Sequence, residues 1–253
     1  MTKEIIINAD DFGLNASVNK AIIESFKNEF INSTTIMANM PGFEEAVELA
    51  HKNNILTKTG IHLILTEGLP LTAGIRKTNL FHNDNDPDLK RHKKSLFFLT
   101  GDEKKLIRKE FAAQIEKVQN TGIQISHIDT HHHIDEVWPV TQIILELLKI
   151  YNIPSMRILN NLNRNTRIYK SVYRRVLNGI LKIKHANFTD YLGNQSEAVS
   201  RLRIDKSFCE KNMIEIMVHP DYNNEGILID RINNQEIVFD KTQDLYKILT
   251  AQK

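Results

Sequence analysis

The feature of this sequence that most constrains its fold is a steady alternation of short apolar runs with longer amphipathic stretches. The runs at 4–9, 33–38 and 213–218 are rich in β-branched residues and have the length of buried strands. The stretches at 15–28 and 106–118 repeat apolar side chains at helical spacing. Because strands that alternate with helices build parallel sheets covered by helices, we predict an α/β fold with a mostly parallel sheet. The alternation alone leaves a barrel and a doubly wound sheet open.

The same alternation continues through the rest of the chain. We expect further strands at 58–65, 123–129 and 155–159, and further helices at 43–53, 140–150, 168–183 and from about 240 onward. No internal repeat or Pro/Ser-rich linker interrupts the pattern, so we expect a single domain over residues 1–253. Residues 66–100 fit neither pattern, and long loops of this kind are often functional. They are interpreted either as a solvated surface excursion or as a lid over a site.

Charge and composition make several classes of protein poor fits. A net charge of +2 calls for neither nucleic acid nor an anionic membrane as partner. The basic residues at 164–184 accompany an apolar stripe between Tyr169 and Leu181, so we interpret them as the solvated face of a packed helix. No apolar stretch reaches the roughly 18 residues of a membrane span, no secretory signal pattern is evident, and the single Cys209 permits no intrachain disulfide. We therefore expect a cytoplasmic protein without a nucleic-acid or membrane partner.

Polar side chains of the kinds that bind metals or transfer protons accompany four of the predicted strands. Asp10 and Asp11 end the first strand, His62 lies in the third, histidines at 127–133 follow a later one, and His219 follows the last. In parallel α/β folds, ligands bind at the carboxyl ends of the strands. In a parallel sheet, these side chains would therefore converge on one face.

The adjacent aspartates allow two interpretations. In a regular strand Asp10 and Asp11 would point to opposite faces, whereas in the turn that follows both can reach one cavity. There one carboxylate can bind a cation while the other accepts a proton. The alternative is that Asp10 or Asp11 caps the helix at 15–28 or forms an Asx turn. The histidines elsewhere in the sequence favour the first interpretation.

The histidine run is difficult to explain by packing. Four of the residues 127–133 are histidines, and His131 and His133 form an HxH pair. Neutral imidazole is the commonest metal ligand in proteins, whereas the alternative is a polar surface loop. Taken alone, His62 and His219 would more often be core histidines with satisfied hydrogen bonds. The run therefore carries the prediction of a metal site.

Four segments also match a known pattern. They are INADDFG at 7–13, GIHLILTEG at 60–68, SHIDTHHH at 126–133 and VHPDY at 218–222. Together they resemble the YdjC-like carbohydrate deacetylase family, which includes the chitooligosaccharide deacetylases. The resemblance implies a single-domain distorted (β/α) barrel that uses a metal to hydrolyse the N-acetyl group of an acetylated amino sugar or short oligosaccharide.

Carried over to the matching positions, the resemblance implies that Asp11, His62 and His131 bind one divalent metal ion. It implies that Asp10 is the catalytic base and that His219 is the acid near the leaving amine. The family points to Mg²⁺, which we expect here. A donor set of one carboxylate and two imidazoles also suits Zn²⁺ or another transition metal, which we keep as the alternative.

Three further residues are candidates for substrate contact. Trp138 could stack on a sugar ring or belong to the core, and His133 is the second histidine of the HxH pair. Arg157, at the end of a short predicted strand, either lines the site or forms an ion pair that positions Asp10. Related sequences often place a histidine where this chain has Asp135, so local substrate contacts are expected to differ from those of the family.

Two other functions fit a similar set of residues. Another metal-dependent amide or phosphoester hydrolase is one, although an amidohydrolase usually carries an HxH pair at its first strand and a phosphoesterase favours two metal ions. A non-catalytic sugar-binding protein is the other, but it would not need Asp10 beside Asp11. The sequence predicts neither the sugar, its length nor its phosphorylation state. A homodimer is expected only because that assembly is common.

Overall fold

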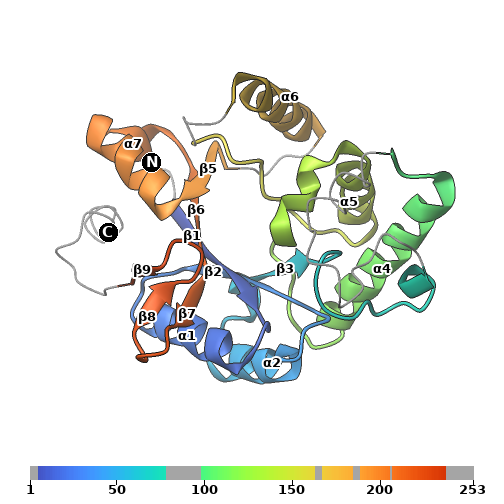
Figure 1. Ribbon diagram of the computed structural model, residues 1–253, viewed down its shortest axis with the longest axis horizontal. Helices are drawn as coiled ribbons and strands as arrows, with labels where there is room; N and C mark the ends of the chain where they lie inside the picture. Colours follow the sequence, from blue (N-terminus) through green and yellow to red (C-terminus); the bar gives the residue numbers. More distant parts are fainter. Residues whose placement is uncertain (1–4, 78–97, 163–166, 185–188, 206, 238–253) are drawn as a thin grey trace.

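The computed structural model describes residues 5–77, 98–162, 167–184, 189–205 and 207–237. Its centre is a six-stranded parallel sheet that curves into a half-barrel with helices around it (Figure 1). In spatial order the strands are β4 (Ile128–Thr130), β3 (Thr59–Leu63), β2 (Ser33–Ile36), β1 (Ile5–Phe12), β6 (Ile214–Val218) and β5 (Tyr191–Asn194). The predicted α/β fold with a parallel sheet is confirmed.

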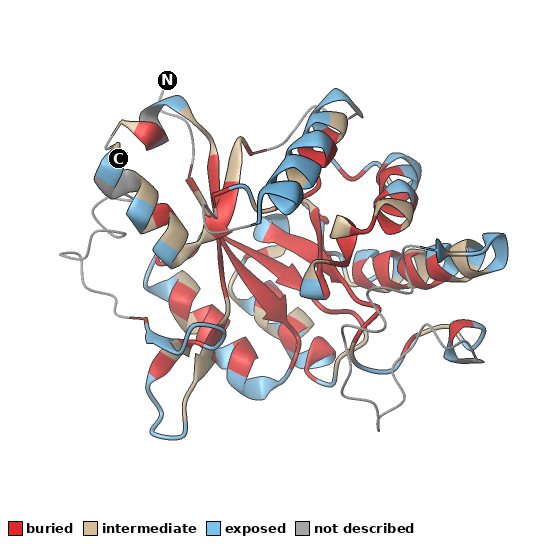
Figure 2. Cartoon of the chain, turned by 45° about the horizontal axis from the view of Figure 1, so that its top comes forward, coloured by how far each residue is buried: buried red, intermediate tan, exposed pale blue. Residues whose placement is uncertain are grey.

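Helices connect the strands and cover the sheet. They are α1 (Ala16–Lys27), α2 (Phe43–Lys52), α4 (Gly101–Gln119), α5 (Trp138–Ile150), α6 (Ile168–Lys184), α7 (Gln195–Ile204) and α8 (Phe208–Lys211), with short 3-10 turns η1 (Leu56–Lys58), η2 (Ile75–Lys77) and η4 (His131–Glu136). Buried residues are concentrated on the strands and on the sheet-facing sides of the helices (Figure 2). The apolar positions of the helical stretches thus form one core with the β-branched strands.

Helix α1 has a cap of its own. The side-chain oxygen of Asn15 accepts a hydrogen bond from the backbone N–H of Val18 at 3.0 Å, which satisfies one of the free donors of the first turn. The alternative that Asp10 or Asp11 caps this helix is therefore wrong. Both carboxylates are available for other partners.

The segment 155–162 spans the opening of the half-barrel. At one end it meets β4 through a single bridge between Ile128 and Met156. At the other end, the backbone N–H groups of Asn161 and Leu162 donate to the carbonyl of Leu192 in β5. The predicted strand at 155–159 is wrong, since it amounts to one bridge. The predicted strand at 123–129 shrinks to β4, because the residues before Ile128 make only single backbone hydrogen bonds to β3, from Ser126 to Thr59 and from Ile61 to His127.

Helix α6 packs less deeply than its sequence predicts. Leu177 and Leu181 are buried, but Tyr169, Val172 and Val176 are each more than half exposed. The interpretation that this whole apolar stripe faces the core is wrong, because the packing of α6 buries only part of it. The side-chain amide of Asn178 attaches α6 to the segment 155–162, donating to the carbonyl of Leu159 and accepting from its N–H.

A second sheet, which the apolar pattern did not predict, follows the half-barrel. It is antiparallel and consists of β7 (Pro220–Tyr222), β8 (Leu228–Asp230) and β9 (Gln235–Glu236), with β7 beside α1. Its strands are too short for an alternating pattern to be recognised, and the same holds for β5. Within the described residues, no helix is both long and apolar enough to cross a bilayer.

Two predictions fall wholly or partly outside the described residues. The helix expected from about 240 lies outside them, as do residues 78–97 of the loop at 66–100. The described start of this loop is attached to α4, because the carboxylate of Glu110 accepts from the backbone N–H groups of Leu71 and Thr72 at 2.9 and 2.8 Å. The lid interpretation stays a prediction.

Candidate metal centre

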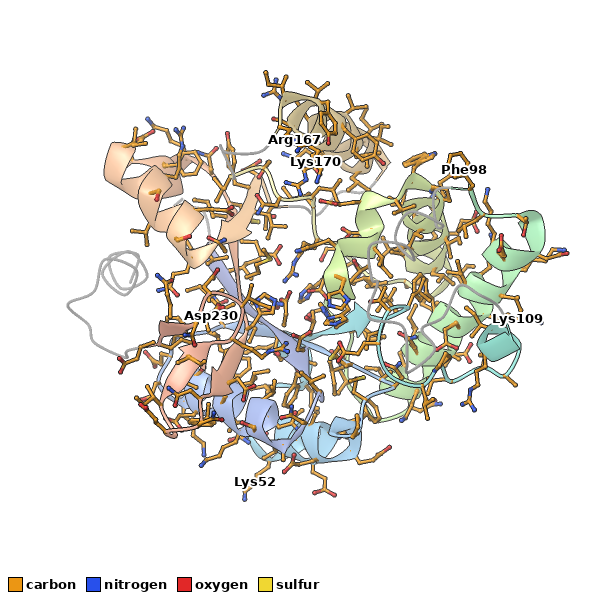
Figure 3. The ribbon with its side chains drawn as sticks, viewed as in Figure 1. Lys52, Phe98, Lys109, Arg167, Lys170 and Asp230 are labelled. Carbon is orange, nitrogen blue, oxygen red and sulfur yellow. The ribbon has the colours of Figure 1, made fainter. Side chains whose placement is uncertain are left out.

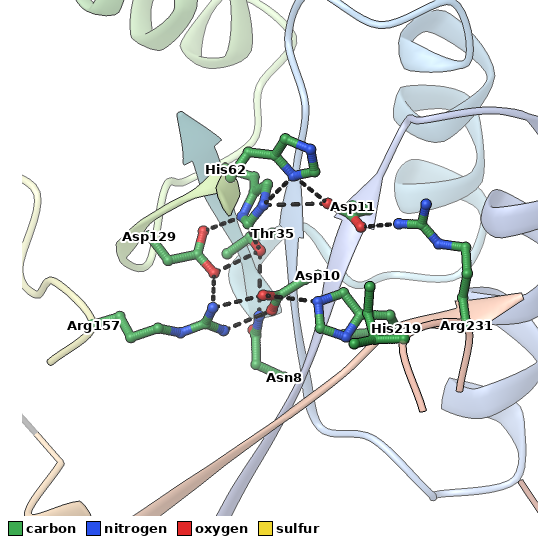
Figure 4. Close-up of polar contacts among 12 residues, drawn as sticks. Asn8, Asp10, Asp11, Thr35, His62, Asp129, Arg157, His219 and Arg231 are labelled. Carbon is green, nitrogen blue, oxygen red and sulfur yellow. Dashed lines mark hydrogen bonds and ion pairs between the residues drawn. The ribbon is translucent and has the colours of Figure 1, made fainter. Parts of the chain in front are cut away.

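A bulge at the end of β1 brings the two adjacent aspartates to the same place. The register between β1 and β2 shifts between Ala9 and Phe12, and Asp11 adopts a left-handed conformation with φ of 69°. Aspartate tolerates this region better than most residues, and a bulge re-aims the side chains around it. The carboxylates of Asp10 and Asp11 consequently both reach one cluster of polar side chains, Asp10 beside Arg157 and His219 and Asp11 beside His62 (Figure 4). This resolves how a strand can place consecutive side chains in one site.

Asp11, His62 and His131 meet with three donor atoms close together. The Nε2 atom of His62 lies 3.2 Å from Oδ1 of Asp11, and Nδ1 of His131 lies 3.0 Å from the same oxygen. The two imidazole nitrogens are 3.3 Å apart. All three residues are buried, and the group could hold a metal ion. The structure therefore brings together the three residues that the resemblance names as ligands.

Each imidazole of this trio is held on its far side by a carboxylate. Nδ1 of His62 lies 2.7 Å from Oδ1 of Asp129, and Nε2 of His131 lies 2.7 Å from Oε2 of Glu67. Carboxylates in these positions orient histidine ligands and fix their tautomer. Asp129 and Glu67 both lie inside the sequence segments that carry the resemblance, but a local pattern does not show that their side chains meet a distant ring.

Arg157 forms ion pairs with three carboxylates next to the trio. Its guanidinium donates to both oxygens of Asp10 at 2.7 Å, to Asp129 at 2.8 Å and to Glu215 at 2.6 Å. Arg157 is only 3% exposed, so it lies behind Asp10 and not on the surface of the site. Of the two roles considered from the sequence, this burial favours positioning Asp10 over direct contact with a substrate.

The centre holds an excess of buried negative charge. The carboxylates of Asp10, Asp129 and Glu215 are buried around the guanidinium of Arg157, and the buried carboxylate of Asp11 lies beside them. Arg231 at the edge contacts the second oxygen of Asp11. By contrast, the exposed basic residues Lys52, Lys109, Arg167 and Lys170 lie at the periphery (Figure 3). A buried excess of anions is unfavourable unless a cation or protons balance it, so the donor set and its charge both fit a divalent ion.

The excess of buried carboxylates also shifts the pKa values of the histidines in the trio. Burial alone would lower the pKa of His62, but Asp129 and Asp11 outweigh it and raise that pKa well above its ordinary value. The pKa of His131 is raised in the same way by Asp11 and Glu67. For Asp10, burial is outweighed by Arg157, which holds the pKa of the carboxyl far below its usual range. The buried carboxylates thus favour positive charge at both imidazoles, as they would favour a cation between them.

His219 lies beside the trio at the end of β6. Its Nε2 atom is 3.8 Å from Oδ2 of Asp10, and its side chain is mostly buried. The backbone around it is fixed, because its N–H donates to the side chain of Asp230 at 3.2 Å and its carbonyl accepts from the N–H of Arg231 at 2.8 Å. His219 is thus placed near the proposed base without belonging to the metal-type trio.

The histidine run divides after His131. His132 and His133 both have left-handed backbones, with φ of 55° and 52°. The ring of His132 packs against that of His131 with centroids 3.8 Å apart, and its Nδ1 lies 2.8 Å from the hydroxyl of Thr66. His132 therefore packs against the trio, although the sequence offered His133 and not His132 as a candidate for substrate contact.

The remaining sequence candidates occupy the start of α5 and its approach. Trp138 is the first residue of α5 and is partly buried, as is His133, and the roles of both in substrate binding stay predictions. Asp135 is buried and accepts a hydrogen bond from the hydroxyl of Thr130 at 2.7 Å. It therefore fixes the turn between β4 and α5.

This fold and this site define a class of protein: a curved parallel α/β sheet with a buried carboxylate–imidazole trio at the carboxyl ends of its strands. A profile of the family described as YdjC-like protein matches residues 4–252, and the chain belongs to this family.

The relatives carry more specific names. A carbohydrate deacetylase of Clostridium beijerinckii is 36% identical over 88% of this chain and 84% of its own length. A carbohydrate deacetylase of Brevibacillus brevis is 31% identical over 98% of this chain and 91% of its own. The crystal structure of a proposed cellobiose-phosphate cleavage protein from Enterococcus faecalis V583 superposes with a TM-score of 0.64 at 24% identity, covering 100% of this chain and 92% of its own. That likeness shows the fold alone.

Proposed function

We propose that this protein is a metal-dependent hydrolase that removes the N-acetyl group from an acetylated amino sugar or short oligosaccharide. The observation that carries the proposal is the buried trio of Asp11, His62 and His131 beside the clamped carboxylate of Asp10. The deacetylase names of relatives that align along most of the chain support the reaction class.

Asp11, His62 and His131 would hold the ion. When bound, a divalent ion supplies Lewis acidity, which lowers the pKa of water and polarises a carbonyl oxygen. The family resemblance supports Mg²⁺, whereas the two imidazoles favour Zn²⁺ on ligand softness, so Mg²⁺ is the proposal and Zn²⁺ the alternative. The contact between Arg231 and one oxygen of Asp11 leaves the other oxygen of that carboxylate toward the histidines.

Asp10 and His219 would move the protons. Hydrolysis adds water to the acetyl carbon, breaks the C–N bond, and requires that a proton leave the water and another reach the nitrogen. Asp10 is the proposed acceptor of the first proton, and Arg157 keeps it ionised and fixed in place. The same ion pair lowers the basicity of Asp10. His219, 3.8 Å from Asp10, is the proposed donor to the departing nitrogen.

The test is acetate release from N,N′-diacetylchitobiose and related N-acetylated sugars. The protein is first treated with chelator and then supplied with Mg²⁺ or Zn²⁺. We expect acetate only after an ion is restored, and the more active ion identifies the cofactor. Acetate release that survives complete metal removal would overturn the metal dependence. Bound metal without acetate from any of these sugars would instead favour another amide or a phosphoester substrate, or a sugar-binding role.

Oligomeric state and cellular location stay predictions. The expected homodimer has one structural correlate, the exposed apolar side chains along α6, which include Ile168, Val172 and Val176. Light scattering at several protein concentrations tests it, and a mass of 29.2 kDa throughout would contradict a dimer. Fractionation of cells tests the expected cytoplasmic location.

A further inference from the structure

The two carboxylates behind the histidines differ in their surroundings. Asp129 is fully buried in β4 and is bound to Arg157 and to the hydroxyl of Thr35 as well as to His62. Glu67 lies in the loop after β3, and its side chain is 44% exposed. Yet both approach their imidazoles at the same distance, 2.7 Å. A half-exposed glutamate needs some other constraint to stay so close to one ring.

The loop around Glu67 supplies this constraint. Gly68 has a left-handed backbone with φ of 71°, and a Cβ at this position would come within 2.5 Å of the sulfur of Met40. The side-chain amide of Asn39 donates to the carbonyls of Glu67 and Leu69, at 3.2 and 3.3 Å, on either side of that glycine. The loop is therefore folded tightly against the chain after β2, in a form that only glycine adopts readily. Its geometry aims Glu67 at His131.

The contact decides which nitrogen of His131 is free. A neutral imidazole carries its proton on one nitrogen and a lone pair on the other. When Nε2–H donates to Glu67, the lone pair resides on Nδ1, which faces Asp11 and His62. If the proton moved to Nδ1, that nitrogen could not bind an ion. Glu67 thus selects the form of His131 that completes the trio.

We propose that Glu67 is a positioning residue, which holds His131 in the tautomer and orientation that present Nδ1 to a divalent cation. The inference rests on the proposed metal site and deepens it. A competing arrangement places Glu67, His131 and His132 around an ion of their own. The buried trio is favoured, because Asp11 and the carboxylates beside it supply the negative charge that Glu67 alone does not.

The test measures metal binding directly. Metal-free wild-type protein, Glu67→Gln and Glu67→Asp are titrated with Zn²⁺ and Mg²⁺ by calorimetry or competition with a chelating dye. We expect Glu67→Gln to bind about 10–100-fold more weakly, as loss of a carboxylate behind a histidine ligand usually does. Glu67→Asp, which keeps the charge, should recover part of this loss. Glu48→Gln on the exposed side of α2 makes the same charge change and should bind like wild type.

Nitrogen spectra of the imidazoles give a second readout that a merely structural role would not move. In zinc-loaded wild-type protein labelled with ¹⁵N, we expect His131 to bind through Nδ1 and to carry its proton on Nε2. In Glu67→Gln the population of this tautomer should fall. Gly68→Ala should weaken metal binding with Glu67 intact, because alanine is strained in this left-handed backbone and its Cβ would also crowd Asn39 and Met40.

The outcomes separate this inference from the proposed function. Wild-type affinity and unchanged Nδ1 ligation in Glu67→Gln would overturn the inference and leave the proposed function standing. Binding through Nε2 in wild-type protein would overturn it in favour of the Glu67–His131–His132 arrangement. Weakened metal binding in Glu67→Gln, in a protein that releases no acetate, would support the inference while the proposed reaction fails. A wild-type protein that binds no divalent ion would overturn both.

Discussion

The half-barrel has a regular side and an irregular side, and both contribute to the same site. Strands β1 to β4 pair side by side in parallel, with one bulge near the end of β1. They carry Asp11 and His62, and His131 comes directly after β4. The opposite side is closed by the segment 155–162, which touches β4 through one bridge and β5 through a few hydrogen bonds. The regular side carries the candidate metal ligands, whereas the irregular side supplies Arg157, which binds the buried side of Asp10.

This difference suggests a division of labour. Of the residues that would hold an ion, Asp11 and His62 lie in paired strands, where neighbouring backbones fix their positions, and His131 directly follows such a strand. Arg157, which is bound to Asp10, comes from a segment outside the strands of the sheet, held by isolated hydrogen bonds such as those of Asn178 and Asn161. Damage to the regular side should therefore abolish chemistry while the fold survives, and damage to the irregular side should first lower the stability of the fold.

The largest effect is expected at the regular side. His131→Ala removes a ligand, so we expect loss of bound metal and a fall in kcat/KM on the order of 10³-fold or more, comparable to losing a whole catalytic group. Metal content by mass spectrometry and acetate release measure it. His133→Ala, two residues further in the same run, should retain its metal. Stoichiometric metal in His131→Ala would contradict the ligand assignment.

Asp10→Asn should separate chemistry from metal binding. The amide keeps the shape of the side chain but cannot accept the proton, so kcat should fall about 10²–10⁴-fold while the metal stays bound. Steady-state kinetics and metal content are measured on the same sample, with a thermal melt to show that the protein is folded. Full activity in this variant would exclude Asp10 as the base.

Arg157→Met tests how far the stability of the fold depends on the irregular side. The change leaves Asp10, Asp129 and Glu215 buried without their shared cation, so the free energy of unfolding should drop by about 3–5 kcal/mol. Denaturant titration measures it. Arg175→Met, on the exposed face of α6, removes the same charge and should change stability by less than about 0.5 kcal/mol. Equal stability of the two variants would show that the buried network contributes nothing.

Two alanine substitutions compare the faces of α6. Leu181 is fully buried, so Leu181→Ala should destabilise the protein by about 2–5 kcal/mol through lost packing and a cavity. Val176 is 55% exposed, and Val176→Ala should cost no more than about 0.5 kcal/mol. A large loss at Val176 in a monomeric sample would mean that this face is covered after all.

The smallest expected effect is on the stability of the fold at low pH, and it comes from His127, which lies where the segment 155–162 meets β4. Burial lowers the pKa of His127, whose neighbour Ser126 accepts a hydrogen bond from Ser155. In the unfolded chain this imidazole protonates near its ordinary pKa of about 6.5. Its contribution to stability is therefore complete above that pH and is lost as the pH falls toward the lower pKa of the folded state. His127→Gln should flatten this decline in melts between pH 7 and 5, and an unchanged slope would contradict it.

The sequence predicted the regular side better than the irregular one, for physical reasons. Strand β1 is dense in β-branched residues, and Asp11, His62 and His131 can be recognised in the sequence because they lie at or near the ends of predicted strands. Closure of the barrel depends on isolated contacts that leave no periodic pattern. The same applies to the partners of the site: Arg157 meets Asp10 across 147 positions, and Arg231 meets Asp11 across 220. For α6, an amphipathic pattern shows that a face is apolar but not whether anything covers it.

The bulge at Asp11 changes how much functional chemistry one strand can deliver. A regular strand offers its site every second side chain, so two useful groups require three positions. The left-handed residue in β1 delivers two consecutive carboxylates, one toward Arg157 and one toward the histidines. Transplanting this site into another half-barrel by copying side chains alone would therefore fail. The graft must include the irregular backbone of residues 9–12 as a unit, because that backbone sets the directions of both carboxylates.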